Sequence, residues 1–256
     1  MPWMNIKGLI NAFNIFCRGN SFVYALKPDI DLCLQIIEKY RIVHVSGVPV
    51  ILETLSKNKS IYDVSSVKFV YTGAAALRDE TIKKLNERFP GLNYIFIGYG
   101  MSECATAVAF DFLDTTQSYK GGVGCIGKTS TVKVVDLESR KALGPNQLGE
   151  ICVKGPLVMK GYVNKDRSID FDDEDFFRTG DMGYYNDDQY IVIVNRLKDL
   201  FKYKDCQIAP GEIEGILVKH PSVVDAAVIG IPHESGGEAP YAFVVVNPED
   251  KRGEDD

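Results

Sequence analysis

Hydrophobic residues recur along the chain with two different periods. Short apolar runs at Val67–Tyr71 and Tyr94–Ile97 predict buried strands, and each run leads into a segment that contains glycine. Between them, Arg78–Phe89 has apolar residues at helical spacing, which predicts a helix that buries Ile82, Leu85 and Phe89. Strand, loop and helix in this order favour a mostly parallel sheet.

The same patterns extend over the first half of the chain. We expect an amphipathic helix at Asp31–Tyr40 with Leu32, Ile36 and Tyr40 aligned, and a short strand at Ile42–Val45. Proline at its start favours a short helix at Pro49–Ser56. A second strand–loop–helix unit is expected at 94–108.

The pattern changes after about residue 120. Short β-rich runs separated by turn residues predict a small barrel or a distorted sheet, at Thr131–Val135, Leu148–Val153 and Tyr190–Val194. Beyond Arg196–Asp199, a small α+β unit is expected, with a helix at Glu212–Lys219 that buries Ile213, Ile216 and Leu217, followed by strands at Val223–Ile229 and Tyr241–Val246. These changes divide the chain into 1–120, 121–195 and 196–256.

Composition excludes several classes of protein. The 256 residues are 45% hydrophobic and 25% charged, as in a soluble globular protein, and the net charge of −6 argues against nucleic-acid binding. No apolar run is long enough to span a bilayer, and no secretory leader is visible. The six cysteines form no CxxC pair, and the three histidines are scattered, so the sequence predicts no zinc site. We therefore expect the thiols to be reduced, in a cytosolic or peroxisomal compartment. Cys104 is expected to be a small packing residue.

Candidate ligand-binding chemistry begins with the segment Phe177–Asp181. An acid at a turn can accept hydrogen bonds from both ribose hydroxyls, which is the role expected of Asp181. The basic residues Arg196 and Lys198 follow after a strand-rich stretch and can face phosphate or carboxylate charge. A surface turn and an exposed charged loop are the alternative interpretation.

Two upstream loops have similar chemistry. Gly73, Ala74 and Ala75 follow a strand, and small residues there let the backbone approach a flat ligand. A tight strand-to-helix turn would also explain them.

The second loop follows the strand at 94–97. Gly98 and Gly100 flank Tyr99, so its ring can lie against a ligand. Ser102 can donate to a phosphate oxygen, and Glu103 can help to hold Mg²⁺. The alternative is a glycine-rich turn that leads to the N-terminus of a helix.

Six segments, taken together, resemble one family. The chain contains, in order, YTGAAAL, GYGMSE, GEICVKGPLVMKGYVN, FFRTGD, NRLKDLFKYKDCQIAPGEIE and HPSVVDAAVIGIPHESGGEAPYAFVV. From about residue 2 to about residue 247 it resembles the adenylate-forming superfamily of acyl-CoA synthetases, 4-coumarate–CoA ligases and insect luciferases. The implied fold is α/β. It comprises part of a large N-terminal domain, made of a parallel-sheet subdomain and a small β-barrel-like subdomain, and a truncated α+β C-terminal lid domain.

The resemblance implies an AMP-forming ligase. Such enzymes use ATP and Mg²⁺ to adenylate a small carboxylic acid, fatty or aromatic, and then transfer the acyl group to coenzyme A. By this resemblance, the nucleotide contacts are Gly73, Ala74, Ala75, Tyr99, Gly100, Ser102, Asp181 and Arg196, with Glu103 as the magnesium-associated carboxylate. Lys198 lies at the hinge of the small domain, and Lys202 and Gln207 match residues of the thioester step. For Lys202, a solvated basic loop is the alternative.

The same resemblance implies a chain incomplete at both ends. Residues 1–256 contain neither the Ser/Thr/Gly-rich phosphate loop nor the C-terminal catalytic lysine of the family. Asn5 stands where relatives usually have His, and Asp205 where many have Gly. Since each lost cation or donor commonly costs about 10²–10³ in rate, we expect weak or no turnover.

Two further expectations follow from an incomplete sheet and an incomplete site. An exposed sheet edge invites aggregation or a partner that covers it. The alternative functions are a non-catalytic remnant that binds AMP or an acyl-adenylate, and an amino-acid adenylation domain.

Overall fold

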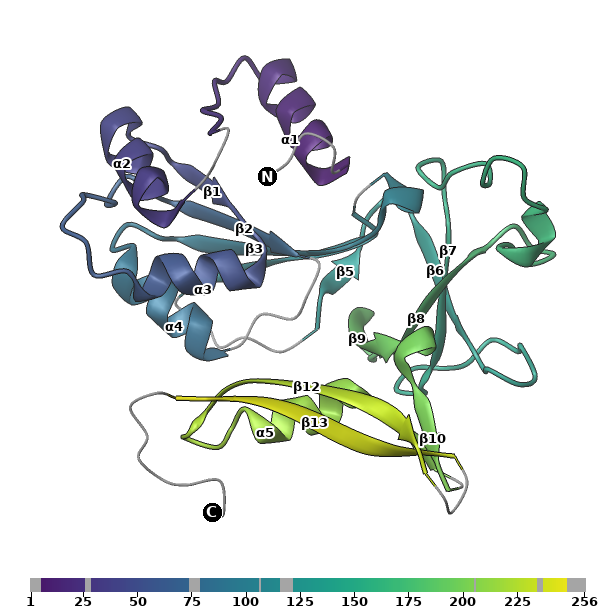
Figure 1. Cartoon of the computed structure of the whole chain (residues 1–256). Coiled ribbons are helices and arrows are strands. Elements are labelled where there is room, and N and C mark those ends of the chain that lie inside the picture. Colours follow the sequence, from purple (N-terminus) through teal and green to yellow (C-terminus); the bar gives the residue numbers. More distant parts are fainter. Residues whose placement is uncertain are drawn as a thin grey trace. The chain divides into compact units, whose positions relative to one another are not determined.

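The computed structural model describes residues 6–25, 29–73, 79–105, 107–115, 122–204, 206–233 and 237–247. These residues belong to two compact units (Figure 1). Unit 1 comprises 1–133, 152–177 and 185–192, and unit 2 comprises 134–151, 178–184 and 193–256. The predicted domain boundaries near 120 and 195 stay a prediction.

Unit 1 is an α/β layer. Its helices are α1 (Ile6–Cys17), α2 (Ile30–Tyr40), α3 (Pro49–Lys57) and α4 (Asp79–Arg88). Its strands are β1 (His44–Ser46), β2 (Phe69–Gly73), β3 (Tyr94–Tyr99), β4 (Ala109–Asp114) and β5 (Gly124–Ile126). Strands β1, β2 and β3 are parallel, whereas β4 and β5 are antiparallel to their neighbours.

The core of unit 1 lies between the parallel strands and the helices. In Figure 1, α3 and α4 lie side by side along the sheet. The predicted face of α4 is confirmed, because Ile82, Leu85 and Phe89 are all buried. They pack with strand residues such as Val70 and Ile95 in one apolar cluster, which holds the carboxyl ends of β2 and β3 in place.

Local signals explain where these helices begin and end. Asp29 caps α2, since its carboxylate accepts a hydrogen bond from the Leu32 backbone N–H at 2.8 Å. Arg41 ends the same helix in the left-handed conformation, with a φ of 50°. Pro49 opens α3, as its fixed φ favours.

The second half of the chain supplies the remaining strands of the large sheet. They are β6 (Thr131–Val135), β7 (Gly149–Lys154), β8 (Phe177–Tyr185) and β9 (Tyr190–Arg196), and the strand order of the sheet is β1-β2-β3-β4-β5-β9-β8-β7-β6. Strand β8 was not predicted. The single-turn 3-10 helices η1 (Ser102–Cys104), η2 (Arg167–Ile169) and η3 (Leu197–Asp199) connect strands.

Unit 2 ends in a small α+β element, as predicted. Strands β10 (Phe201–Tyr203) and β11 (Cys206–Ile208) form a hairpin-like pair, followed by α5 (Pro210–Leu217). Strands β12 (Val223–Pro232) and β13 (Glu238–Val246) form a long antiparallel pair (Figure 1). Helix α5 packs against β12.

Three sequence predictions are wrong in detail. Helix α2 buries Leu34 and Ile37, whereas Tyr40 is 53% exposed, because the helix is rotated relative to the predicted alignment. The predicted helix before residue 108 is the single turn η1 followed by the antiparallel strand β4.

The third error concerns α5. Pro210 is its one buried residue within the described part of the chain, and Ile216 is 67% exposed. A helix of eight residues that packs on one β pair can cover only part of its apolar side.

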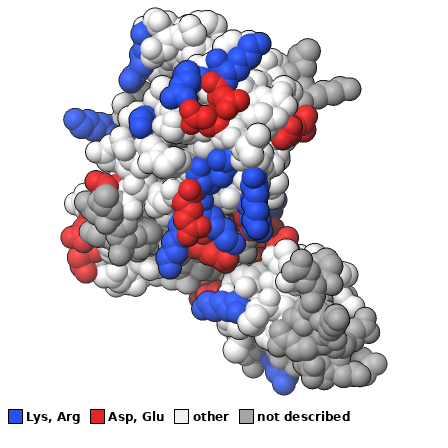
Figure 2. Space-filling view, turned by 90° about the vertical axis from the view of Figure 1, so that its left-hand side faces the viewer, with Lys and Arg blue, Asp and Glu red and all other residues white. Residues whose placement is uncertain are grey.

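Two surface properties complete the description. None of the helices in the described ranges is long and apolar enough to cross a bilayer. On the face drawn in Figure 2, Lys and Arg side chains are interspersed with Asp and Glu side chains. Charges of both signs therefore lie close together on this face.

Candidate functional site

Tyr99 closes strand β3 at the edge where parallel strands of unit 1 end. Its ring is half-buried, and its carbonyl accepts a hydrogen bond from the Val108 backbone N–H at 2.8 Å. A Cβ on Gly98 would lie 3.1 Å from the Tyr71 hydroxyl oxygen, so close packing explains glycine there. The loop that leaves β3 is thus held at both ends, with Gly100 between them.

Gly73 ends the neighbouring strand β2. It is buried, and it is the parallel partner of Gly98 in the sheet register. Two candidate loops therefore start from paired positions at the carboxyl ends of adjacent strands, which is where α/β folds bind ligands. Ala74 and Ala75 lie outside the described residues.

Ser102 and Glu103 open the single turn η1. The Ser102 side chain is exposed, and Cys104 behind it is buried, as expected of a packing residue. Ala105 ends the turn in the left-handed conformation with a φ of 48°. This turn presents Ser102 and Glu103 one after the other beyond the end of β3.

Glu103 is held by a later segment of unit 1. The Tyr162 hydroxyl donates a hydrogen bond to the Glu103 Oε1 atom at 2.6 Å, and the Met159 backbone N–H donates to the Glu103 carbonyl at 2.7 Å. The hydrogen bond to the Glu103 carboxylate, with burial and the negative charges of Glu103 and Asp170, raises the pKa of Tyr162 to about 12. Sequence reasoning did not single out Tyr162, although it lies in a quoted motif.

Asp181 lies within strand β8, not at a turn as predicted. Gly180 has a φ of 70°, so the strand is locally irregular at this glycine, and the glycine is what predicted a turn. Asp181 is 2% exposed, and the Arg196 Nε atom donates to its Oδ1 atom at 3.0 Å. The structure therefore brings these two predicted residues together inside unit 2.

Strand β7 supports this acid. The Thr179 hydroxyl donates to the Ile151 carbonyl at 2.6 Å and accepts from the Asp181 backbone N–H at 3.0 Å. The Glu150 carboxylate accepts from the Gly180 backbone N–H at 3.1 Å and pairs with the Arg140 guanidinium at 2.6 Å. Glu150 is 4% exposed. One oxygen of its buried carboxylate thus holds the strand segment before Asp181, and the other is paired with Arg140.

Glu150 was missed by sequence reasoning. The available signal was a carboxylate inside the apolar run Leu148–Val153, because a charge is rarely buried without a partner. Its partner Arg140 has a left-handed φ of 57° in a turn, and no sequence period connects the two.

Lys202 and Gln207 lie directly opposite each other. They are cross-strand partners in the β10–β11 pair, and both side chains are exposed. Lys198 is exposed in η3, a few residues earlier. The three residues that the resemblance assigns to the hinge and the thioester step therefore lie in one short part of unit 2.

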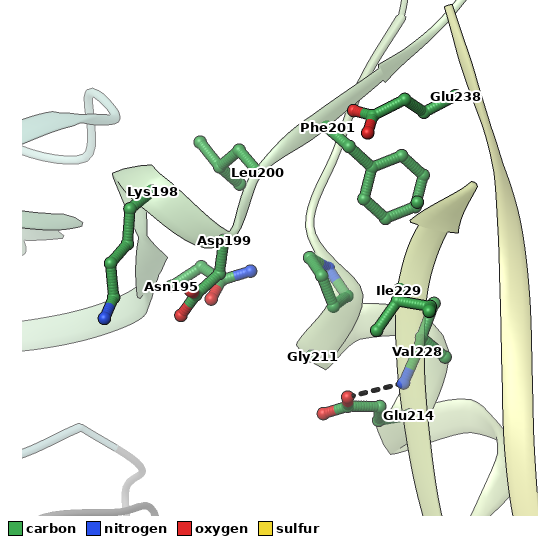
Figure 3. Close-up of a pocket in the computed structure, with 12 residues that line it drawn as sticks. Asn195, Lys198, Asp199, Leu200, Phe201, Gly211, Glu214, Val228, Ile229 and Glu238 are labelled. Atoms are coloured by element: carbon green, nitrogen blue, oxygen red, sulfur yellow. Dashed lines mark hydrogen bonds between the residues drawn. The ribbon is translucent and has the colours of Figure 1, made fainter. Parts of the chain in front are cut away.

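A pocket of about 380 Å³ lies beside that part of unit 2 (Figure 3). Lys198 is the one predicted site residue among those that line it within the described chain. On the far side, the Glu214 Oε1 atom accepts from the Val228 backbone N–H at 2.9 Å. The lining residues are Asn195, Lys198, Asp199, Leu200, Phe201, Pro210, Gly211, Glu214, Val228, Ile229, Gly230 and Glu238.

The predicted site residues Glu103 and Asp181 fit the ligands that the resemblance implies. The described residues contain no cluster of three or more metal-binding side chains, so they offer no dedicated protein cage. Mg²⁺ normally needs only one or two carboxylates together with substrate phosphates, which suits Glu103. The buried acid Asp181 suits a neutral diol. A common cradle of Tyr99, Glu103 and Asp181 stays a prediction, because Asp181 belongs to unit 2 and the other two to unit 1.

Comparison with known proteins gives consistent matches. Residues 1–163 match the family model described as AMP-binding enzyme, and residues 212–256 match the AMP-binding enzyme C-terminal domain. The chain is 41% identical to 4-coumarate–CoA ligase of Pinus taeda, over 97% of this chain and 48% of that protein. It is 35% identical to luciferin 4-monooxygenase of Nipponoluciola cruciata, over 96% of this chain and 45% of that protein.

Solved structures agree. ATP-bound MatB from Rhodopseudomonas palustris superposes with a TM-score of 0.87 at 28% identity, covering 99% of this chain and 50% of that one. The o-succinylbenzoate CoA synthetase of Bacillus subtilis with its acyl-adenylate intermediate gives a TM-score of 0.83 at 25% identity, covering 96% and 50%. The chain spans about half the length of the relatives that it matches.

Proposed function

The chain belongs to the family of AMP-binding enzymes, and on that premise we propose that it forms the adenylate-binding part of an AMP-forming acid–thiol ligase. The whole protein would join a fatty or aromatic carboxylic acid to AMP and then pass the acyl group to the thiol of coenzyme A. In the first step, a carboxylate oxygen attacks the α-phosphorus of ATP and pyrophosphate leaves. In the second, the thiol sulfur attacks the acyl carbon and AMP leaves.

The observation that carries this proposal is the built support around Asp181. A carboxylate that is 2% exposed is costly unless its partners satisfy it, and here Arg196 reaches it at 3.0 Å. The strand before it is held by Glu150 and Thr179. Such support is typical of a site that must present one acceptor accurately to a ligand. Asp181 would accept from the ribose hydroxyls, and Arg196 would contact ribose or phosphate.

The remaining roles belong to the loops of unit 1 and to the hinge segment. Gly73, Ala74 and Ala75 would line the adenine and acyl pockets, with Tyr99 stacked on adenine and Gly100 giving it room. Ser102 would contact the α-phosphate, and Glu103 would hold Mg²⁺, which offsets the negative charge of the phosphates. Lys198 would act as the hinge, and Lys202 and Gln207 would assist thioester formation.

Titration calorimetry with AMP tests the proposal on the 256-residue chain. We expect saturable binding that Asp181→Ala abolishes and Tyr99→Ala weakens. Asp188→Ala is the matched control, because Asp188 is an exposed acid in the same part of the sequence. Absence of heat and of thermal stabilisation at millimolar AMP would refute the proposal.

Pyrophosphate release distinguishes the three functions. Release that depends on coumarate-like or fatty acids supports a ligase, whereas AMP binding without release supports a non-catalytic binding protein. Release that depends on amino acids would instead support an amino-acid adenylation domain. We expect slow or no turnover from these 256 residues.

We further propose a cytosolic or peroxisomal location and a partner for the sheet edge. The six free cysteines are compatible with a reducing compartment. Strand β1 is at one end of the strand order, and exposed aromatic residues continue inward from it on β2, β3 and β4, where Phe69, Tyr94 and Phe112 are between 39% and 61% exposed. Sedimentation analysis checks the partner, since a strictly monomeric chain with no tendency to associate would speak against it.

A further inference from the structure

Tyr162 has a specific contact with the proposed magnesium carboxylate, although no role has been assigned to it so far. Its hydroxyl and the Glu103 Oε1 atom are 2.6 Å apart, which is the ordinary length of a hydrogen bond from a hydroxyl to a carboxylate. The residues are 59 positions apart in sequence, and both belong to unit 1. A second bond, from the Met159 backbone N–H to the Glu103 carbonyl, joins the same two segments.

Glu103 needs an external restraint because its own element is small. The turn η1 has three residues, and a glutamate side chain has several rotatable bonds. Mg²⁺ requires nearly ideal octahedral geometry, so a carboxylate with a fixed orientation binds it better than a mobile one. The hydroxyl of Tyr162 supplies that restraint from outside the turn.

Tyr162 is itself held in place. The Lys165 ammonium lies 5.1 Å from the centre of its ring, and the same ammonium pairs with Asp170 at 2.7 Å. The ring is 43% exposed, so removal of its hydroxyl should disturb the core little. An ordinary tyrosine hydroxyl carries its proton at neutral pH, so Tyr162 can donate this hydrogen bond without any special environment.

We propose that Tyr162 is a positioning residue for magnesium-dependent nucleotide binding, and that it acts by fixing the orientation of the Glu103 carboxylate. The inference rests on the proposed function. It goes beyond the proposed function by assigning a task to the segment 155–163, which contacts η1 through Met159 and Tyr162. Tyr162 remains neutral throughout and transfers no proton.

The test is calorimetry of ATP binding to the full chain, in Mg²⁺ and in EDTA. In Tyr162→Phe we expect the Mg²⁺-dependent gain in ATP affinity to fall by about 3- to 10-fold, the value of one net hydrogen bond, with affinity in EDTA unchanged. In Glu103→Gln the gain should disappear, and adding Tyr162→Phe to that variant should change nothing more. Tyr40→Phe, at an exposed tyrosine far away in sequence, is the matched control.

The outcomes separate the two proposals. If the wild-type chain shows no Mg²⁺-dependent ATP binding, the positioning role is refuted, whereas the proposed function fails only if the chain does not bind AMP either. If the wild-type chain binds but Tyr162→Phe behaves like Tyr40→Phe, only the positioning role is refuted. An equal loss of ATP affinity on Tyr162→Phe in the wild-type chain and in the Glu103→Gln variant would also refute the positioning role, because a purely structural effect would not depend on the carboxylate.

Discussion

Glu150→Ala removes a buried carboxylate that would touch no ligand and yet holds the strand segment before Asp181. The change leaves the Gly180 backbone N–H without its acceptor, which costs about 1–3 kcal/mol. It also releases the Arg140 guanidinium. Because the Arg140 side chain is 37% exposed and can be rehydrated, that loss adds only about 0–1 kcal/mol. The free energy of unfolding should therefore fall by about 2–4 kcal/mol, including the small cavity left behind.

Urea unfolding followed by circular dichroism measures this loss as a lower midpoint at unchanged slope. Glu150→Gln keeps an acceptor for Gly180 but loses the charge that faces Arg140, so about half of the loss is expected. Lys84→Ala is the matched control. It breaks the exposed pair with Glu80, which should cost no more than about 0.5 kcal/mol.

AMP binding gives the functional consequence of the same change. Asp181 follows Gly180 directly, so a displaced strand should weaken AMP binding in Glu150→Ala more than in Glu150→Gln, under conditions where both are folded. The reasoning is refuted if Glu150→Ala unfolds at the same urea concentration as Lys84→Ala, or if AMP affinity is unchanged in a destabilised Glu150→Ala chain.

Three further predictions concern the core, pH and the thiols. Leu85→Ala should lower the free energy of unfolding by about 2–5 kcal/mol, whereas Ile216→Ala, at a site 67% exposed, should lower it by less than about 0.5 kcal/mol; similar urea midpoints would contradict the assigned burial. The pKa of Asp172 is lowered, because the Lys133 ion pair and the Phe176 and Glu174 backbone N–H groups outweigh the effect of burial. The ionised carboxylate therefore stabilises the fold above its unfolded pKa, and this stabilisation is lost as the pH falls through the folded pKa. Acid unfolding of Asp172→Asn should show a weaker pH dependence than that of the wild type below about pH 4. Cys17, Cys125 and Cys206 should react with a thiol reagent in the native chain, and Cys104 and Cys152 only after unfolding, which thiol titration with and without denaturant measures.

The elements of the α/β part could be predicted because their signals are local. The helical period of Ile82, Leu85 and Phe89 gave the buried face of α4, and the apolar runs gave β2 and β3. Proline gave the start of α3. The order of six short motifs likewise indicated the family before any comparison, and the family match agrees.

The buried face of a short helix could not be predicted from the local pattern in the same way. Burial in α2 and α5 depends on which strands and helices pack beside them, and local period alone does not contain that information. A period read from three apolar residues therefore aligned Tyr40 with Leu32 and Ile36 and buried Ile216, although Tyr40 and Ile216 are both exposed.

The sequence alone determined which chemical groups are available to the candidate site: an acid at 181, a guanidinium at 196, a carboxylate at 103 and the glycines around Tyr99. Only the tertiary structure decided which of them meet. The pair of Asp181 with Arg196, the support from Glu150 and the contact of Tyr162 with Glu103 all join residues far apart along the chain. Hydrogen bonds act over a few ångströms in space, whereas sequence patterns report neighbours along the backbone, so these contacts follow from the packing of strands and loops.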